Sequence, residues 1–286
     1  MKLYYRMGEI EAWRDRTHRR LPHLALRSEE EARVFIGEVG FCSAHNPAPA
    51  DVPSLWQAVC GERIPAPPRI MHPDPTLALV SRIRNLLPGE GTAFYGRLLR
   101  RQPALVSLDL FPCFFALGHR AGLRNDYKLD YTRGRLSRAA RDLMEALRAS
   151  SPQVSHALRL GTGMHGRDRK TVFEKALAEL QSGLYVFKSG GNGGPATSEW
   201  ALVDRRFAPQ VRKARRIMPA EGRERILEAH VRNQLVVSAA AVQKVFGWTR
   251  QEVFQALGRL VRRGVIARGA AVENRGNNFY CWIQGS

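Results

Sequence analysis

The chain has 286 residues and a mass of 32.2 kDa, more than one typical domain of roughly 100 to 150 residues, which favours two or three small modules. Lys and Arg number 45 against 26 Asp and Glu, so the formal net charge of +19 indicates a polyanionic partner. The chain has no apolar run near the roughly 20 residues that span a bilayer, no apolar signal segment and no CxxC pair among its four cysteines. These features argue against a membrane-spanning protein, a secreted protein, a zinc knuckle and a disulfide framework.

Arginine supplies most of the positive charge, since only seven of the 45 basic residues are lysines. The planar guanidinium makes bidentate contacts with phosphate and guanine, which favours nucleic acid as the partner. A GC-rich genome would explain the choice of arginine over lysine, but not the excess of 19 positive charges. An anionic membrane surface is the weaker alternative, because no basic amphipathic anchor helix stands out. We therefore expect a cytoplasmic, nucleoid-associated monomer that binds double-stranded DNA and has neither a membrane nor a small-molecule partner.

Residues 1–130 are interpreted as a degenerate first winged-helix module. The pattern of Ser28 followed by Glu31 is typical of a helix start, and "SEEEARVFIGEVGF" predicts a helix that runs to about Val39. "PSLWQAVCG" predicts a short helix and "TLALVSRIRNLL" an amphipathic one. "GTAFYGRLLRRQPALVSLDLFPCFFALGHR" predicts a turn, a basic segment and an apolar helix.

Residues 131–208 are predicted to form a second module. A helix is expected from Ser137 to Ala149, a short helix in "SPQVSHALRLG" and a longer one in "RDRKTVFEKALAELQSG". The strand-like runs "LYVFKS" and "SEWALVD" flank the glycine-rich "GGNGGPAT", which indicates a two-stranded wing. Residues 209–222 read as a basic linker that contains two prolines.

Residues 223–286 give the clearest pattern. A first helix in "GRERILEAHVRNQLVVS" is followed by a short helix from Ser238 to Gly247, and Thr249 is placed to cap a third. Around "NRGNN", the runs "VIARGAAVE" and "FYCWIQ" predict a hairpin. Three helices and a two-stranded wing make a winged helix-turn-helix, so the expected fold is mainly α with small β-hairpins (α+β), built from tandem modules. The buried stripe of the third helix is predicted to comprise Val253, Phe254, Leu257, Leu260 and Val261.

An ordered set of short motifs carries a family resemblance. "EVGF", "PSLW", "GEGTAFYGRLLRRQPALVSLDLFPCFFAL", "GRLSRAARDLMEAL", "FEKALAELQ" and a tryptophan near the return strand of the second wing resemble the AlkZ/YcaQ-type DNA glycosylases. The resemblance covers roughly residues 28–283. It implies tandem winged-helix modules around a C-shaped DNA-binding cleft, and excision of alkylated or crosslinked purines. The alternative is a non-catalytic regulator or lesion-recognition factor on the same scaffold, and a third option is an RNA-binding or protein-docking module.

The family carries a Gln-x-Gln or Gln-x-Asp motif just after a glycine-hydrophobic pair. Here Gly40-Phe41 is followed by Cys42 and Ala44 in one register and by Ser43 and His45 in the next, so neither register recreates the motif. Excision would be metal-free and would use water. A Schiff base is not expected, since this stretch has no lysine. His45 could hold that water or be a structural loop residue. The candidate catalytic residues are Cys42, Ser43, His45 and Asp51.

The candidate DNA contacts are the basic and polar groups around the third helices, the wings and the linker. Phosphate contacts suit the arginines, whereas glutamines at a helix start can read adenine. A solvated arginine face, or a helix packed on another module, is the alternative at each place. The expected contacts are Arg97, Arg100, Arg101, Arg167, Arg169, Lys170, Arg212, Lys213, Arg215, Arg216, Trp248, Thr249, Arg250, Gln251, Gln255, Arg268 and Arg275.

No cofactor or metal is expected. The glycine-rich "LPGEG" and "SGGNGG" lack the lysine and Ser/Thr ending of a phosphate-binding P-loop, and no metal-ligand spacing is convincing.

Overall fold

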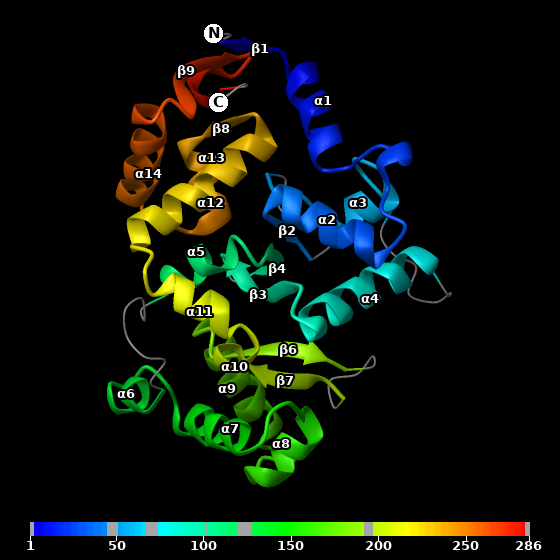
Figure 1. The fold of residues 1–286 in the computed structure, drawn as a ribbon, viewed down its shortest axis with the longest axis vertical. Helices are drawn as coiled ribbons and strands as arrows, with labels where there is room; N and C mark the ends of the chain where they lie inside the picture. Colours follow the sequence, from blue (N-terminus) through cyan, green and yellow to red (C-terminus); the bar gives the residue numbers. More distant parts are fainter. Residues whose placement is uncertain are drawn as a thin grey trace.

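The computed structural model describes residues 3–44, 51–66, 74–100, 102–118, 127–191 and 197–283. Three winged-helix modules follow one another along the chain, each with the order helix, short strand, helix, helix and two-stranded wing (Figure 1). The predicted mainly α fold with small β-hairpins is therefore confirmed. The C-shaped cleft stays a prediction. None of the helices in these ranges is both long and apolar enough to cross a membrane.

The first module begins where the Ser28 hydroxyl accepts a hydrogen bond from the Glu31 N–H at 3.1 Å. Its first helix ends at Gly40, whose φ of +77° is unfavourable for residues with a Cβ. The segment that the sequence presents as a turn and a basic stretch is in fact a wing, with a sheet order of β2-β4-β3. The elements are α2 (Glu29–Val39), β2 (Phe41–Ser43), α3 (Leu55–Cys60), α4 (Pro75–Glu90), β3 (Ala93–Leu99) and β4 (Gln102–Ser107).

The second module follows the predicted pattern. The Ser137 hydroxyl caps its first helix by accepting from the Ala140 N–H at 3.2 Å, and Leu143, Met144 and Leu147 are buried on one face. The strand after this helix, which the sequence did not reveal, completes a sheet of order β5-β7-β6. The elements are α7 (Arg138–Ala149), β5 (Gln153–Val154), α8 (Ser155–Gly161), α9 (Lys170–Ser182), β6 (Val186–Gly190) and β7 (Glu199–Leu202).

The third module also matches its pattern, except at Phe254. This side chain is 43% exposed, because it lies one position beyond the buried Val253 and so about 100° around the helix from it. The prediction that Phe254 belongs to the buried stripe is therefore wrong. The elements are α12 (Pro219–Gln234), β8 (Val236–Ser238), α13 (Ala239–Phe246), α14 (Arg250–Arg262), β9 (Ile266–Val272) and β10 (Gly276–Trp282).

The N-terminal residues pack on the last module. The strand β1 (Tyr4–Tyr5) pairs in parallel with β9, and α1 (Met7–Thr17) lies along α12. The Trp13 indole N–H donates to the Arg232 carbonyl at 2.8 Å, and the Thr17 hydroxyl donates to the Asn233 carbonyl at 3.1 Å. A short 3₁₀ helix, η1 (Pro22–Leu24), leads from there to α2. Although the sequence places the N-terminus with the first module, its contacts with the third are extensive.

The segments between modules are packed helices. They are α5 (Phe111–Ala116), α6 (Tyr127–Thr132), α10 (Val203–Arg206) and α11 (Ala208–Ala214). The stretch expected to be a basic linker contributes Val211, Ala214 and Ile217 to the core, and α11 packs against α5. The modules are therefore held by a continuous apolar core.

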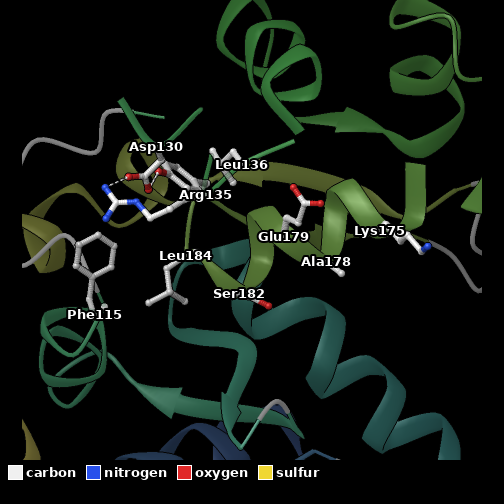
Figure 2. A pocket seen from close by; sticks show the side chains of 12 residues that line it. Phe115, Asp130, Arg135, Leu136, Lys175, Ala178, Glu179, Ser182 and Leu184 are labelled. Atoms are coloured by element: carbon white, nitrogen blue, oxygen red, sulfur yellow. Dashed lines mark hydrogen bonds and ion pairs between the residues drawn. The ribbon is translucent and has the colours of Figure 1, made fainter. Parts of the chain in front are cut away.

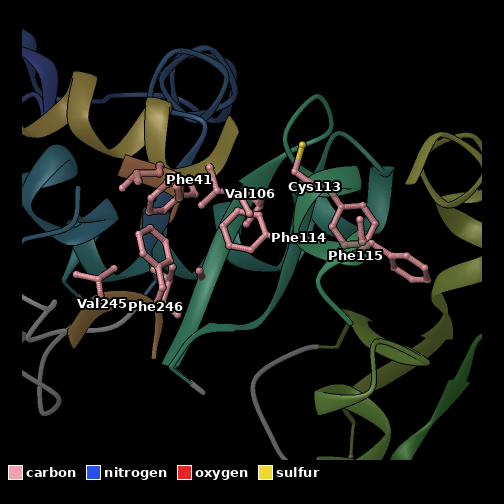
Figure 3. Packing of buried hydrophobic residues seen from close by; sticks show 14 of the residues in the cluster. Phe41, Val106, Cys113, Phe114, Phe115, Val245 and Phe246 are labelled. Carbon is pink, nitrogen blue, oxygen red and sulfur yellow. The ribbon is translucent and has the colours of Figure 1, made fainter. Parts of the chain in front are cut away.

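Aromatic rings make up much of this core. Figure 3 shows Phe41, Phe114 and Phe246, which come from the first module, α5 and the third module. The ring centroids of Phe41 lie 5.7 Å from those of both Phe114 and Phe246. Farther along, Phe111 stacks on Phe94 of the first wing with centroids 4.0 Å apart. These contacts join elements from different modules.

The N-cap of α14 gives a first stability prediction. The Thr249 hydroxyl accepts from the Glu252 N–H at 3.3 Å, and the Glu252 carboxylate accepts from the Thr249 N–H at 2.8 Å. We expect Thr249→Ala to lower the free energy of unfolding by about 1 kcal/mol, since it leaves helix N–H groups unsatisfied. Chemical denaturation measures this loss. Thr249→Ser keeps the hydroxyl and is the control, and an equal loss in both variants would contradict the capping role.

Candidate nucleic-acid interface and active site

The third module carries an open hollow between α13, α14 and the β9–β10 wing. Its volume is about 720 Å³. Two arginines reach it from different elements, Arg250 at the start of α14 and Arg268 on β9, and none of the described residues that line it is acidic. Uncharged polar groups complete the lining, among them Gln243, Asn277 and Asn278. This arrangement offers hydrogen-bond donors and positive charge to an anionic ligand.

The outward face of α14 continues this surface. A second hollow of about 480 Å³ lies along it, and Phe254 lines both hollows. The Arg250 guanidinium carbon lies 5.6 Å from the centre of the Phe254 ring, a cation–π distance. The acidic residue of α14, Glu252, is bonded to Arg223 and to the helix cap, so it does not offset these charges. The polar residues of the second hollow are Gln251, Gln255, Arg259 and Arg262.

Two expected DNA contacts in this module have structural roles. Trp248 is half-buried and stacks on Phe246, with ring centroids 4.5 Å apart. Thr249 is exposed, but its hydroxyl is engaged in the helix cap. By contrast, Arg250, Gln251, Gln255, Arg268 and Arg275 are exposed, as a DNA contact requires.

The expected contacts of the second module lie at the start of α9. Arg167, Arg169 and Lys170 are all exposed. An ion pair joins Arg169 to Asp168 at 3.6 Å, and another joins Lys170 to Glu174 at 3.9 Å. Exposed pairs of this kind contribute little stability, so all three cations can turn to a phosphate.

The first wing brings basic residues toward the third module. Arg97 and Arg100 are exposed, and Arg100 has a φ of +46° at the wing turn. The Arg100 side chain lies over Gly247, at the turn before α14. Arg101 lies outside the described residues. The wing tip is therefore close to the N-terminus of α14.

The connector also presents its positive charges to solvent. On and just after α11, Arg212, Lys213, Arg215 and Arg216 are exposed, and no carboxylate in the described ranges forms an ion pair with them. Their backbone is fixed by the buried Val211 on the same helix.

The predicted catalytic residues on β2 are packed inside the protein. Cys42 is 0% exposed in an apolar cluster, and burial raises the pKa of its thiol to about 12. Ser43 is equally buried, and its N–H donates to the Pro53 carbonyl at 2.7 Å. Ala44 is buried as well, and His45 lies outside the described residues. The side chains on both faces of β2 are thus buried, and none of the three residues of this strand carries a carboxamide or carboxylate that could position water.

Asp51 lies in a different environment, at the start of the segment that pairs with the end of β2. Its side chain is half-buried, and its carboxylate is 3.9 Å from Arg14 Nη2. Arg14 also contacts Glu11 at 3.1 Å, and Arg20 contacts Glu11 at 2.8 Å. This charged cluster has no local signal in the sequence, because its members on α1 precede β2 by more than 20 residues.

Buried polar residues lie next to this cluster. His230 on α12 is fully buried and stacks on Phe41, with centroids 6.2 Å apart. Neither ring nitrogen has a hydrogen-bond partner among the described residues. Burial, together with the smaller effect of the nearby Arg14 charge, lowers the pKa of His230 to about 3. His18 is also buried with a lowered pKa, and its Nε2 lies 3.3 Å from Gln234 Nε2.

These histidines predict a loss of stability in acid. Because the folded pKa of His230 is below the unfolded value near 6.5, its contribution is complete above pH 6.5 and is lost as pH falls toward about 3. We expect His230→Gln to flatten the pH dependence of the unfolding free energy there, by up to about 1.4 kcal/mol per pH unit. Urea denaturation between pH 7 and pH 4 measures the slope. The exposed His156→Gln is the control, and equal slopes in wild type and His230→Gln would refute the prediction.

A further hollow of about 560 Å³ lies between the end of α5, α6 and α9, and Figure 2 shows its lining. Asp130 accepts a hydrogen bond from the Tyr185 hydroxyl and lies 2.6 Å from Arg135 Nη2. Glu179 accepts from the Ser137 N–H at 2.8 Å. These carboxylates stabilise the second module. Across the described ranges, no three His, Cys, Asp or Glu side chains are grouped so as to hold a metal ion.

Comparison with known proteins supports the resemblance seen in the sequence. A family model described as "AlkZ related" matches residues 26–247, which include the first two modules and the first two helices of the third. A search of curated proteins finds no match. Among solved structures, the Streptomyces sahachiroi DNA glycosylase AlkZ is similar with a TM-score of 0.61 and 12% identity, covering 99% of this chain and 71% of that one. This likeness concerns the fold, whereas the family match spans well over half of the sequence, and the chain therefore belongs to the AlkZ-related family.

Proposed function

We propose that this protein binds double-stranded DNA through α14 and the β9–β10 wing, and that it acts in DNA repair by recognising damaged bases. The observation that carries the proposal is the hollow of about 720 Å³ between α14 and the wing, whose described lining includes Arg250 and Arg268 and no acidic side chain. Membership of the AlkZ-related family supports the same function. The protein would act as a cytoplasmic, nucleoid-associated monomer that needs no cofactor.

The exposed residues of α14 suit contacts in the major groove. A third helix of a winged module enters that groove with its N-terminal turn. Arg250 can form two hydrogen bonds with guanine or a phosphate, and Gln251 and Gln255 can read adenine. Arg268 and Arg275, on the wing, would contact the backbone and fix the position of α14 without reading sequence.

The exposed cations of the other modules would add phosphate contacts and so extend the DNA interface beyond the third module. The start of α9, the first wing and α11 each supply arginine or lysine side chains that face solvent. Phosphate contacts of this type release counterions, so binding weakens as salt rises. If six to ten of these groups contact phosphates, the association constant falls by roughly 10³ to 10⁵ between 50 and 200 mM salt.

Fluorescence anisotropy with a labelled duplex of about 20 base pairs tests the proposal. The expected result is tight binding at 50 mM salt, with a logarithmic salt dependence that corresponds to at least six phosphate contacts. Binding to an undamaged duplex and to one with a 7-methylguanine shows whether the lesion adds affinity. The absence of duplex binding at 50 mM salt would end the proposal.

Base excision is a second candidate function, which the position of Asp51 favours. A carboxylate beside β2, the strand where the family's Gln-x-Gln or Gln-x-Asp motif would lie, can orient water toward C1′ and stabilise positive charge on the sugar. Water would form the new C1′–O bond as the glycosidic C–N bond breaks, and the base would leave with the bonding pair and acquire a proton. The Arg14 guanidinium, 3.9 Å away, would hold the Asp51 carboxylate in place.

The burial of Cys42, Ser43 and Ala44 favours the non-catalytic alternative. Release of free base from a 7-methylguanine duplex, at protein excess, separates the two. If base is released, Asp51→Asn should abolish release, and Cys42→Ala should not. His45→Ala tests the remaining candidate. Tight lesion binding without release would identify a recognition factor.

A further inference from the structure

A separate basic hollow lies where the first and second modules meet. Its volume is about 440 Å³, and it is lined by parts of α4, the β3–β4 wing, α9 and the β6–β7 wing. We call it the intermodule pocket. Its cations are Arg84 on α4, Arg97 on β3 and Lys188 on β6, so each comes from a different element. Because α4 packs closely on β6, the three are held by the contact between the modules.

These cations are not neutralised within the described part of the chain. None of the described residues that line the pocket is acidic, and Arg84, Arg97 and Lys188 form no ion pair with a described carboxylate. Arg82, two residues from Arg84 on the same helix, differs, since its Nε donates to Glu29 at 2.7 Å. Of the two arginines on α4, it is therefore Arg84, which lines the pocket, that keeps its charge unpaired among the described residues.

The positive charge of Lys188 is destabilised in the intermodule pocket. Lys188 is half-buried, and burial lowers the pKa of its ammonium group, while the charge of Arg84 lowers it further. An anion bound beside Lys188 would offset both effects, because it pairs with the ammonium group and screens its repulsion from Arg84. The pocket also offers the uncharged polar side chains of Ser81, Asn85 and Gln181.

We propose that the intermodule pocket binds a phosphate group through Arg84, Arg97 and Lys188. Three cations and several neutral donors that line one hollow suit the tetrahedral, multiply charged oxygens of phosphate. Resting on the proposed function, the assigned source is a backbone phosphate of bound DNA, and a free phosphate ion offers the same chemistry. A phosphate held here contacts both modules at once, so DNA binding would stabilise their relative arrangement.

The test compares Lys188→Gln and Arg84→Gln with the matched control Arg82→Gln. Each variant removes one positive charge, but only the first two alter the pocket. The salt dependence of duplex affinity is measured by anisotropy for all three and for wild type. We expect the slope of log K against log salt to shrink by about 0.9 in each pocket variant and to stay unchanged in Arg82→Gln. Melting temperatures without ligand check that the variants fold.

A thermal-shift series with inorganic phosphate, at constant ionic strength, distinguishes the two sources. Stabilisation of wild type but not of Lys188→Gln, together with the reduced slope, supports a phosphate site occupied by DNA. The same stabilisation with an unchanged slope supports the phosphate site and overturns DNA as its source. If Lys188→Gln and Arg84→Gln change neither the salt slope of duplex affinity nor the thermal stabilisation by phosphate, the pocket binds no phosphate.

The outcomes also separate this inference from the proposed function. Duplex binding that depends on Arg250 but not on Lys188 would refute the pocket as a DNA contact and leave the proposed function intact. A pocket-dependent phosphate shift in a protein that does not bind duplex would refute the proposed function and leave the phosphate site intact.

Discussion

Charge reversal at both Arg250 and Arg268 is expected to weaken duplex binding by about 10²-fold or more at 100 mM salt. Both side chains are exposed, line the same hollow and form no ion pair with a described carboxylate. The double variant Arg250→Glu/Arg268→Glu therefore removes two contacts and adds repulsion from the phosphates. Anisotropy titration of a labelled duplex measures the change.

The control must change the net charge equally, because a protein with a charge of +19 attracts DNA over some distance. Arg33→Glu/Arg82→Glu does so on α2 and α4, at exposed arginines that already pair with Glu30 and Glu29. We expect the duplex affinity of this variant to fall only a few-fold, since charges far from the DNA are screened at 100 mM salt. Equal losses of duplex affinity in the two double variants would show that the overall positive charge of the protein, and not the α14 surface, attracts the DNA.

The second large effect concerns stability. Phe111 is fully buried, stacks on Phe94 at 4.0 Å and meets Phe207 edge-on at 5.4 Å. We expect Phe111→Ala to lower the free energy of unfolding by about 3 to 5 kcal/mol, because it removes ring contacts and leaves a cavity between modules. Urea denaturation followed by circular dichroism measures this.

Phe254→Ala is the matched control for this substitution, since the same ring is removed from an exposed position. Its expected cost is below about 1 kcal/mol. If Phe111→Ala cost no more than Phe254→Ala, the aromatic core would not hold the modules together.

Most of the helices could be predicted from the sequence, because their signals are local. Caps at Ser28 and Thr249 mark helix starts, and the structure shows each hydroxyl accepting the expected hydrogen bond. The spacing of apolar residues in the long helices predicts which of their faces is buried. Phe254 shows the limit, since an aromatic residue beside an apolar stripe reads as core even when the helix turns it outward.

The missed elements are those defined by pairing with distant residues. The strands β2, β5 and β8 have only two or three residues, too few for a periodic pattern. The pairing of β1 with β9 joins segments about 267 residues apart, as in Tyr4 with Ala271. In the first wing, Arg97 and Arg100 conceal the strand pattern, so β3 looked like a basic turn.

Local sequence patterns also predict only part of the candidate site. The exposed arginines on α14 and the wing could be predicted, because they lie in one amphipathic helix pattern and in the hairpin pattern that follows it. The charged cluster at Asp51 and the intermodule pocket could not be predicted, because their members lie on elements that only the fold brings together. Trp248 shows a further limit, since its position suits either base contact or packing, and the structure shows packing on Phe246.

Hydrogen–deuterium exchange with and without a duplex tests most directly whether the third module binds DNA. Free and bound protein are compared at low salt by mass spectrometry. The proposal predicts slower exchange in peptides from the start of α14 and from the β9–β10 hairpin, Ile266–Trp282. Full binding with unchanged exchange in both segments, and protection elsewhere, would contradict it.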